Sequence, residues 1–317
     1  KYLTIPDIIR MSNNVSHHVH PGQNEKQTPE LKDIVQNYTI TGDYLSIENE
    51  GYTIYQFISG SGSIEILDNN EEVDILMIGG GGGNGGYDDR NGVGGYGGAG
   101  GVISTMTSRG SRHDIPKLNL QAGQTYNFNV GTFKGLRQNG GDTTFSGLGV
   151  NLIAKGGGRG GWRRRDTKVN GANGGSGGGA PVWNNGGNRW HESPGSGTEN
   201  QGHNGSTGAQ DSYLGGGGGG AGGSAGRFNQ HAWGGDGITS NITGTTYKYA
   251  AGGSSGIRDK NLYGKVRGRN FGNYNANSGE GSGNGGGSPG IFIIKIKIPT
   301  VGIPPYTNMY YNLARNV

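Results

Sequence analysis

Six stretches of the sequence consist mostly of glycine, and glycine supplies 72 of the 317 residues. Leu, Ile, Val and Phe together make up about 18% of the chain, just below the level at which strongly charged chains are expected to be disordered. The net charge is only +4, so the self-repulsion that keeps disordered segments expanded is missing. The glycine must therefore be ordered by something other than a large apolar core.

The glycine stretches show a three-residue period. Between Val93 and Val102 the only other side chains belong to Tyr96 and Ala99, so a side chain recurs at every third position. Three residues per turn is the repeat of the extended polyproline-II-type helix, which makes no internal hydrogen bonds. We therefore expect these stretches to bond laterally to one another, with each third side chain pointing outward. The alternative is that they are disordered loops.

This expectation assigns a scaffold role to glycines in each of the main stretches. Without side chains, they would let neighbouring backbones approach closely enough to bond N–H to C=O. These scaffold glycines are Gly79, Gly80, Gly94, Gly95, Gly97, Gly98, Gly156, Gly157, Gly174, Gly175, Gly217 and Gly218.

Outside the glycine stretches, alternating β-branched and aromatic residues predict strands. Gly, Asn and Asp turn signals separate them, which indicates an antiparallel sheet. Several of these strands enter or leave a glycine stretch and would fix its ends. The predicted strands cover residues 38–47, 51–59, 62–67, 73–79, 102–106, 126–130, 142–145, 150–154 and 291–298.

The order of several segments resembles a known family. They are GYTIYQFISGSGSIEI, VDILMIGGGGGNGG, YGGAGGVI, LQAGQTYNFNVG, GDTTFSGLGVNLIAKGGGRGG and GGGSPGIFIIKIKI. From about Gly51 to Pro299 they are similar to the glycine-rich domain of phage tail-fibre and adhesin proteins and of virion proteins of large DNA viruses. The resemblance implies an all-β fold, a jelly-roll-like antiparallel β-sandwich fused to a bundle of polyglycine II helices. The glycine-rich region of anaplastic lymphoma kinase is similar in plan, although that family contains cysteine and this chain has none.

We expect three parts in the chain. Residues 1–37 form a polar docking arm with short helices at 6–11 and 29–35, residues 38–299 form the glycine-rich domain, and residues 300–317 form a tyrosine-rich docking tail. The chain opens at Lys1 without an apolar leader, so we expect that it has been processed or trimmed. No apolar run reaches the length of a membrane span, which argues against insertion into a membrane.

The sequence favours no catalytic chemistry and no cofactor. It has no cysteine, no P-loop, no HExxH and no nucleophile elbow. The adjacent carboxylates at 71–72 and 88–89 are typical of solvated turns. His18 and His20 form an HxH step, which we interpret as part of a solvated polar arm; the alternative is that it lines the axis of a trimer and holds a metal, as such steps do in trimeric phage fibres. We expect no enzyme and no metal site.

A basic cluster, GGGRGGWRRR, contains Arg159, Trp162 and residues 163–165. Arginine and tryptophan together suit phosphate attraction and base stacking, as in RGG-type nucleic-acid contacts. The chain has a single RGG triplet, whereas such segments repeat it. We therefore interpret the cluster as a charged loop between glycine helices and expect no nucleic-acid partner.

All four tryptophans lie in the glycine-rich half, among Asn, His and Arg residues that are common in recognition loops. The hypothesis is that loops 87–92, 162–170, 182–193 and 227–236 form one surface at an end of the bundle that contacts a receptor or glycan. The alternative is that the rings cover the sides of the bundle or fill a protomer interface. The candidate contact residues are Tyr87, Trp162, Arg163, Arg165, Trp183, Trp190, His191, Phe228 and Trp233.

Taken together, these observations predict a non-enzymatic structural protein of the virion surface, capsid-associated or a tail-fibre adhesin, that attaches to a host. Its location would be extracellular. Its partners would be other virion proteins, copies of itself in an oligomer such as a trimer, and a host glycan or protein. The alternatives are a purely architectural capsid or matrix glycine-rich protein without a receptor, and a glycine-rich RNA-binding protein.

Overall fold

The structure is a computed structural model that describes residues 36–88, 92–106, 114–164, 167–185, 188–208, 214–228, 231–254, 279–281 and 287–299. The expected arm and tail, with their helices and His18 and His20, lie outside these residues apart from positions 36 and 37. Residues 36–300 make up one compact unit. Its described part contains strands and no helix, so the expected all-β class is confirmed. No described helix is long and apolar enough to cross a membrane.

One antiparallel sheet has five strands in the order β1-β4-β10-β11-β12. Gly62 in β4 lies beside the ring of Phe128 in β10, where no Cβ would fit. In β10, buried Tyr126 and Phe128 alternate with exposed Asn side chains. This alternation is typical of a sheet with one face exposed to solvent. The strands are β1 (Tyr38–Ile40), β4 (Ser61–Ile66), β10 (Thr125–Asn129), β11 (Thr143–Gly147) and β12 (Val150–Ala154).

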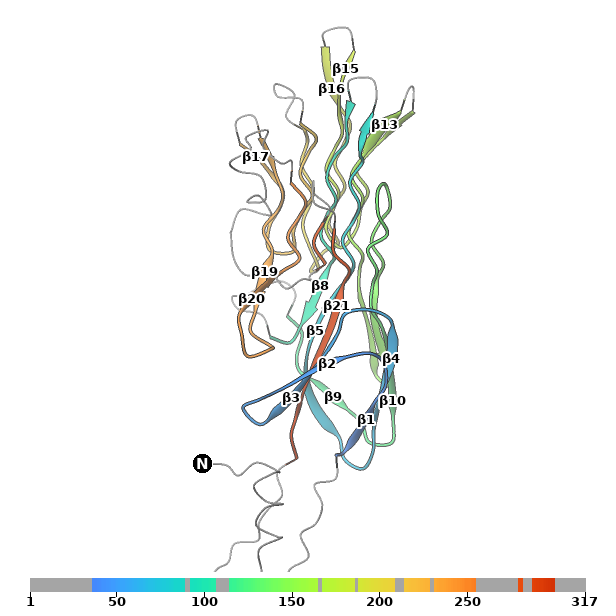
Figure 1. Cartoon of the computed structure of the whole chain (residues 1–317), viewed down its shortest axis with the longest axis vertical. Helices are drawn as coiled ribbons and strands as arrows, with labels where there is room; N and C mark the ends of the chain where they lie inside the picture. The colour runs from blue at the N-terminus through green and yellow to red at the C-terminus, as the bar shows by residue number, and fades with distance from the viewer. Residues whose placement is uncertain are drawn as a thin grey trace, which may run out of the picture. The chain divides into compact units, whose positions relative to one another are not determined.

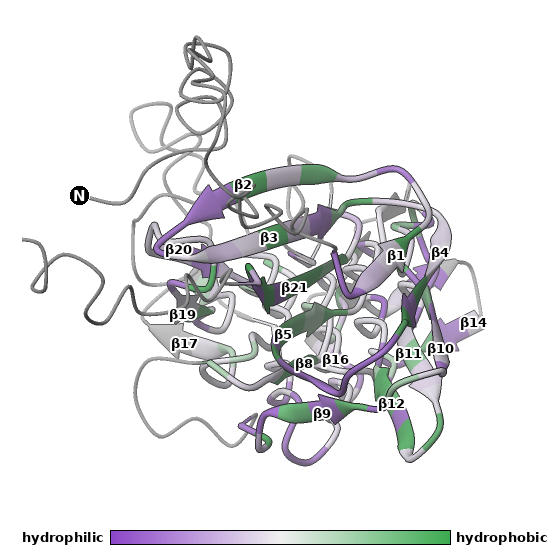
Figure 2. Ribbon diagram, turned by 90° about the horizontal axis from the view of Figure 1, so that it is seen from below, coloured by the Kyte–Doolittle hydropathy of each residue, from purple (hydrophilic) through white to green (hydrophobic). Residues whose placement is uncertain are grey.

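The second sheet has six strands, five of them in the order β2-β3-β21-β5-β8, with β9 paired to the start of β5. Figure 2 shows β21 and β5 in the green of hydrophobic residues, between β3 on one side and β8 on the other. The strands are β2 (Leu45–Asn49), β3 (Tyr52–Phe57), β5 (Glu71–Ile78), β8 (Val102–Ser104), β9 (Leu118–Leu120) and β21 (Ile291–Lys297).

The two sheets pack on a shared apolar core. Between the sheets, Phe57 contacts Phe128, and Phe292 contacts Phe128 and Phe145, with ring centroids 4.1–5.1 Å apart. Such ring pairs add specific contact energy to the area they bury. We call the two packed sheets the base of the molecule, and this core holds them together.

The six-stranded sheet is buried on its other face as well. Alternate residues of β5 and β21 point away from the first core into a second apolar cluster, which includes Leu76, Ile293, Ala99 and Ile238. Burial on both faces explains why VDILMI and IFIIKI read as continuous apolar runs rather than as alternating patterns. The second cluster joins the sheet to the glycine stretches.

The glycine stretches bond to one another through their backbones. Stretches 79–86 and 94–101 run antiparallel, and their bonds are 2.8–3.1 Å long and recur every third residue. The donors and acceptors are Gly79 to Gly101, Gly82 to Gly98 and Gly85 to Gly95. Intervening residues bond elsewhere, since Gly80 and Gly83 donate to residues 141 and 138. In Figure 1 these stretches continue from the ends of the strands as long unpleated traces.

Stretch 94–101 lies at the centre of this arrangement. Its backbone bonds to stretches or residues 79–86, 155–161, 176–179, 216–219, Gly253 and Gly279. Relative to it, 155–161 runs antiparallel, whereas 216–219 runs parallel, because Tyr96 and Ala99 donate to Gly216 and Gly219 in rising order. A β-strand has two neighbours in its sheet, so a stretch with six neighbours is bonded in a different way.

Close approach explains the glycine at the scaffold positions. At Gly95 a Cβ would overlap the carbonyl oxygen of Gly179, and at Gly157 it would overlap that of Gly98. Backbone atoms of a neighbouring stretch block a Cβ in the same way at Gly79, Gly80, Gly94, Gly98, Gly156, Gly174, Gly175, Gly217 and Gly218. The remaining scaffold residue, Gly97, accepts a hydrogen bond from Gly253.

The side chains at every third position do not reach solvent in the central stretch. Tyr96 is buried, and Ala99 and Val102 are part of the second apolar cluster. They point outward from their own stretch, as expected, but into the interior of the molecule. The repeat therefore supplies side chains to a core in addition to leaving room for backbone bonds.

Ten of the strands fall where alternation predicts them, and the others are short. Most of the short strands form hairpins at the ends of glycine stretches, in segments expected to be loops. They are β6 (Tyr87–Asp88), β7 (Gly92–Val93), β13 (Trp162–Arg164), β14 (Thr167–Val169), β15 (Val182–Asn185), β16 (Asn188–His191), β17 (Gly226–Phe228), β18 (His231–Trp233), β19 (Ile238–Ser240) and β20 (Tyr247–Tyr249).

Candidate functional site

Three of the four loops expected to form a surface lie together. Strands β15 and β7 pair, so β16, β15, β7 and β6 form one four-stranded sheet. The β13–β14 hairpin packs beside β6 and β7. Figure 1 shows these hairpins at the end of the glycine stretches away from the two large sheets. We call this group of hairpins the hairpin cluster.

The fourth loop lies elsewhere. Strands β17 and β18 form their own two-stranded sheet. Figure 1 shows β17 on the opposite side of the glycine stretches from β13, and Figure 2 likewise shows β17 far from β14. Trp233, in β18, is partly buried. The structure therefore does not bring Trp233 into one surface with the other tryptophans.

Two arginines lie over the ring of Trp162. The Arg159 Cζ atom is 4.3 Å from the centre of the Trp162 ring, and the Arg137 Cζ atom is 5.5 Å from it. Both arginines are also held by backbone: Arg137 Nε donates to the carbonyl of Gly85 at 2.9 Å, and Arg159 Nη1 donates to that of Asn170 at 3.1 Å. Burial lowers the pKa of Arg159 from its ordinary value, yet a guanidinium stays charged in proteins.

Trp183 has a similar environment. The Arg163 Cζ atom and the Lys168 Nζ atom lie 5.0 Å and 5.3 Å from the centre of its ring. Trp183 is only 3% exposed, so its ring is covered. Cations over indole rings are attracted by the negative face of the ring. Trp183 therefore fixes cations at the surface rather than presenting its own face.

Trp190 is the exposed ring of the cluster. It lies opposite Trp183 in the β15–β16 hairpin, and it is 54% exposed. The neighbouring His191 is also exposed, and its Nδ1 atom lies 3.2 Å from the carbonyl oxygen of Glu192. These two side chains are open to a ligand.

For three of the residues expected to contact a ligand, the structure does not describe the side chain. Tyr87 and Phe228 belong to β6 and β17, and their side chains lie outside the described part of the structure. Arg165 lies outside the described residues altogether. Their roles stay predictions.

Comparison with known protein families shows to which family the chain belongs. The sequence model of a glycine-rich domain family matches residues 58–296, which is most of the chain. The chain belongs to the glycine-rich domain family. The match begins after β3, so β1, β2 and β3 lie before it, but it includes the whole hairpin cluster. The cluster is therefore part of this glycine-rich domain. No curated protein matches the chain.

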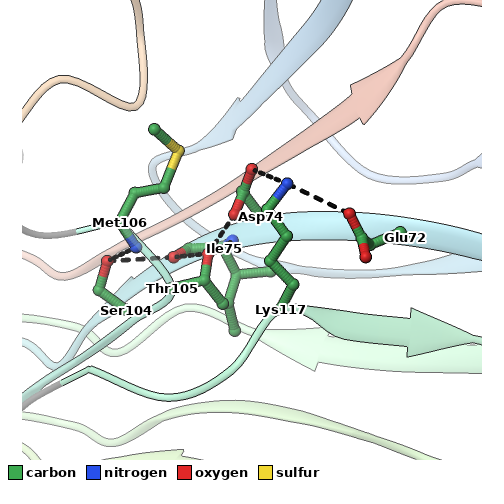
Figure 3. A network of polar contacts seen from close by, with 7 residues as sticks. All are labelled: Glu72, Asp74, Ile75, Ser104, Thr105, Met106 and Lys117. Carbon is green, nitrogen blue, oxygen red and sulfur yellow. Dashed lines mark hydrogen bonds and ion pairs between the residues drawn. The ribbon is translucent and has the colours of Figure 1, made fainter.

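A separate polar network lies on the six-stranded sheet (Figure 3). Buried Asp74 accepts a 2.9 Å hydrogen bond from the Thr105 hydroxyl and pairs with Lys117 at 3.4 Å. Lys117 also pairs with Glu72 at 3.2 Å. The hydrogen bond to Glu72, then the charge of Asp74, raises the pKa of Lys117. This network ties the segment after β8 and the start of β9 to β5. In the part of the chain that the structure describes, no group of three His, Asp or Glu side chains could hold a metal ion.

Sequence reasoning missed two of the cations over the tryptophans. Arg137 is 25 positions before Trp162, and no sequence pattern links them. For Lys168 the sequence does contain a signal: Arg163 and Lys168 flank a short turn, so hairpin pairing would place them opposite each other.

Proposed function

We propose that this glycine-rich domain protein is a non-enzymatic attachment protein of a virion surface, in which a rigid glycine scaffold displays the hairpin cluster to a host glycan or protein. The proposal is carried by one observation: at the end of the glycine stretches the hairpin cluster presents an exposed aromatic ring, Trp190, paired with Trp183, over which two cations lie. Exposed aromatic residues beside polar and charged ones are common at recognition surfaces.

The scaffold in this proposal is a bundle of polyglycine II helices attached to a jelly-roll-like sandwich. Support comes from the three-residue step of the bonds, from the six neighbours of stretch 94–101, and from the mixture of parallel and antiparallel neighbours. In addition, none of the described glycines at 79–85 and 94–101 has positive φ, as expected for a left-handed extended helix. Lateral bonding gives rigidity without a large apolar core, which suits a display scaffold.

Hydrogen exchange tests the scaffold directly. Amides in 94–101 should exchange far more slowly than in a free peptide, because each donates to a neighbouring backbone carbonyl or is enclosed by other stretches. Exchange at free-peptide rates across 79–101 and 215–222 would contradict the bundle. The measurement is exchange followed by mass spectrometry on the full chain.

A glycan array displaying neutral, sialylated and sulfated glycans tests attachment. Trp190→Ala should lose most of the binding of the full chain. Leu148→Ala is the matched control, since Leu148 is 53% exposed and lies in the β11–β12 turn of the base. Equal binding by both variants, with both folded, would contradict a role for the cluster. A wild-type chain that binds neither the array nor cells would contradict attachment itself.

A purely architectural role is the second candidate, and a surface of the base favours it. Strand β2 is at the edge of its sheet, and Leu45 and Ile47 are 60% and 41% exposed. Exposed apolar residues on a sheet edge are typical of contacts between chains. Here they would pair with a second copy. In sedimentation, Ile47→Lys should lower the oligomeric state, and labelling of intact particles would show whether Trp190 is covered by neighbours or open.

A further inference from the structure

The net charge of the protein is concentrated in one segment of the hairpin cluster. Residues 159–170 contain five basic residues and one acidic residue, which gives this segment a charge of +4. The full chain also has a net charge of +4, so the rest of the sequence sums to zero. A local field of one sign attracts ligands of the opposite sign and raises their association rate.

The register of the β13–β14 hairpin places two cations against each other. Arg163 lies directly opposite Lys168, and like charges in such a pair destabilise a sheet. Both cations lie over Trp183, which attracts them and keeps them close. An anion bound at this point would replace repulsion between the two cations with attraction to both.

The neighbouring rings cannot serve as stacking surfaces. Arg159 and Arg137 lie over Trp162, and Trp183 is covered. Proteins that bind single-stranded nucleic acid stack successive bases on open aromatic rings. Among the tryptophan rings of the cluster that the structure describes, Trp190 is the most exposed, and it is paired with Trp183, over which Arg163 and Lys168 lie. This arrangement favours a ligand that carries many anionic groups and needs little stacking.

The cations are also held in place before a ligand arrives. Arg137 and Arg159 each donate to a backbone carbonyl while lying on a ring. A side chain that is already ordered loses less entropy on binding. Guanidinium groups bind sulfate, carboxylate and phosphate oxygens through paired hydrogen bonds.

We propose that Arg137, Arg159, Arg163, Lys168 and Trp190 form a binding surface for an anionic polysaccharide. Its sulfate or carboxylate groups pair with the four cations, and a sugar ring lies against Trp190. This inference rests on the proposed attachment function and names the chemical class of its ligand.

The test measures binding of the full chain to immobilised heparin, to desulfated heparin and to neutral dextran over a range of salt concentrations. Wild type should bind heparin in preference to the other two, with affinity that falls as salt rises. Arg163→Gln/Lys168→Gln should weaken heparin binding about tenfold or more, as expected for the loss of charge-assisted hydrogen bonds.

The control variant is Lys295→Gln/Lys297→Gln in the base. It removes the same charge, and it also removes a cation from an aromatic ring, because Lys295 Nζ lies 4.3 Å from the centre of the Tyr52 ring. Heparin affinity should stay within about twofold of wild type, since only long-range attraction is lost. Circular dichroism and thermal unfolding are used to check that both variants are folded.

Three results would overturn the inference and leave attachment in place. Equal binding to heparin and neutral dextran would exclude recognition of the anionic groups, and equal loss in the test and control variants would exclude this surface. Tighter binding to single-stranded DNA of equal charge would assign the surface to nucleic acid. In each case loss of array binding by Trp190→Ala would still support attachment. If wild type bound cells but no glycan, the inference alone would fail, and if it bound neither, attachment would fail with it.

Discussion

The Thr143 hydroxyl donates a 2.6 Å hydrogen bond to the carbonyl oxygen of Ile78, the last residue of β5 before the glycine stretch begins. The same hydroxyl accepts a 2.8 Å bond from the N–H of Gly131. One buried side chain thus satisfies two backbone groups where the five-stranded sheet, the six-stranded sheet and the glycine stretches meet. The two large sheets and the glycine stretches are joined here by polar contacts as well as by the second apolar cluster.

We expect Thr143→Val to destabilise the protein by about 2–4 kcal/mol, because it leaves a buried donor and a buried acceptor unsatisfied. The change keeps the shape of the side chain, so little cavity cost is added. Thr144→Val, on the opposite face of the same strand, is the control and should cost under about 1 kcal/mol. Chemical denaturation measures both, and equal losses would show that the Thr143 hydroxyl has no special role.

The second prediction concerns close approach in the central stretch. Gly95→Ala would place a Cβ on the carbonyl oxygen of Gly179, and backbone must move to relieve the overlap. We expect a loss of about 3 kcal/mol or more, the upper range for overpacking. Gly226→Ala is the control, because nothing lies within 4 Å of the position that its new methyl group would take. Thermal unfolding would contradict the bundle if the two variants had the same midpoint.

The third prediction concerns the contribution of the buried Asp74 carboxylate to stability. Asp74→Ala removes the acceptor of the Thr105 hydroxyl and one partner of Lys117, and should destabilise the chain by about 1–3 kcal/mol. Glu72→Ala breaks the other pair of Lys117, which is exposed on both sides. Such pairs contribute little, so its effect should stay under about 1 kcal/mol. Chemical denaturation measures both losses, and a larger loss of stability for Glu72→Ala than for Asp74→Ala would contradict this prediction.

The fourth prediction is a loss of stability at alkaline pH. Burial, then the hydrogen bond with Tyr38, raises the pKa of Tyr55 above its ordinary value. The unfolded chain therefore releases this proton near pH ~10 while the folded chain keeps it, so stability falls as pH rises above that point. The raised pKa of Lys117 acts in the same direction, because its stabilising charge is lost at high pH.

Tyr55→Phe should flatten the fall in unfolding free energy between about pH 9.5 and 11.5, the range above the ordinary tyrosine pKa. Its stability at pH 8 will also drop, because the bonds to Gln36 and Tyr38 are lost, so the slope with pH is the relevant quantity. Leu148→Ala, which changes no titratable group, should keep the wild-type slope. An unchanged slope in Tyr55→Phe would contradict the prediction.

The sequence predicted the large strands well because their side chains alternate or form apolar runs. It also predicted lateral bonding of the glycine stretches from the spacing of Tyr96 and Ala99. It could not show that these side chains are buried, since the repeat alone does not say what surrounds each stretch. The shared core of the two sheets follows from pairings such as β4 with β10, between residues far apart in the sequence.

The candidate site was predicted less completely. Composition singled out the tryptophan loops but treated them as equivalent, whereas Trp183 is covered and Trp190 is open. That difference depends on which cations lie over each ring. Arg137 reaches Trp162 from another stretch, and nothing in the local sequence of either residue indicates the contact.

The three-residue bonding step sets how this protein can change in length. Inserting three residues into each of two bonded stretches would restore the bonds between those two stretches one step further along, and would extend the pair by about 9 Å at the rise of a polyproline-II-type backbone. Inserting one or two would aim each N–H at the wrong neighbour. Related chains should therefore vary in length by multiples of three on facing stretches, so that the distance between the hairpin cluster and the two large sheets can change while both keep their own structures.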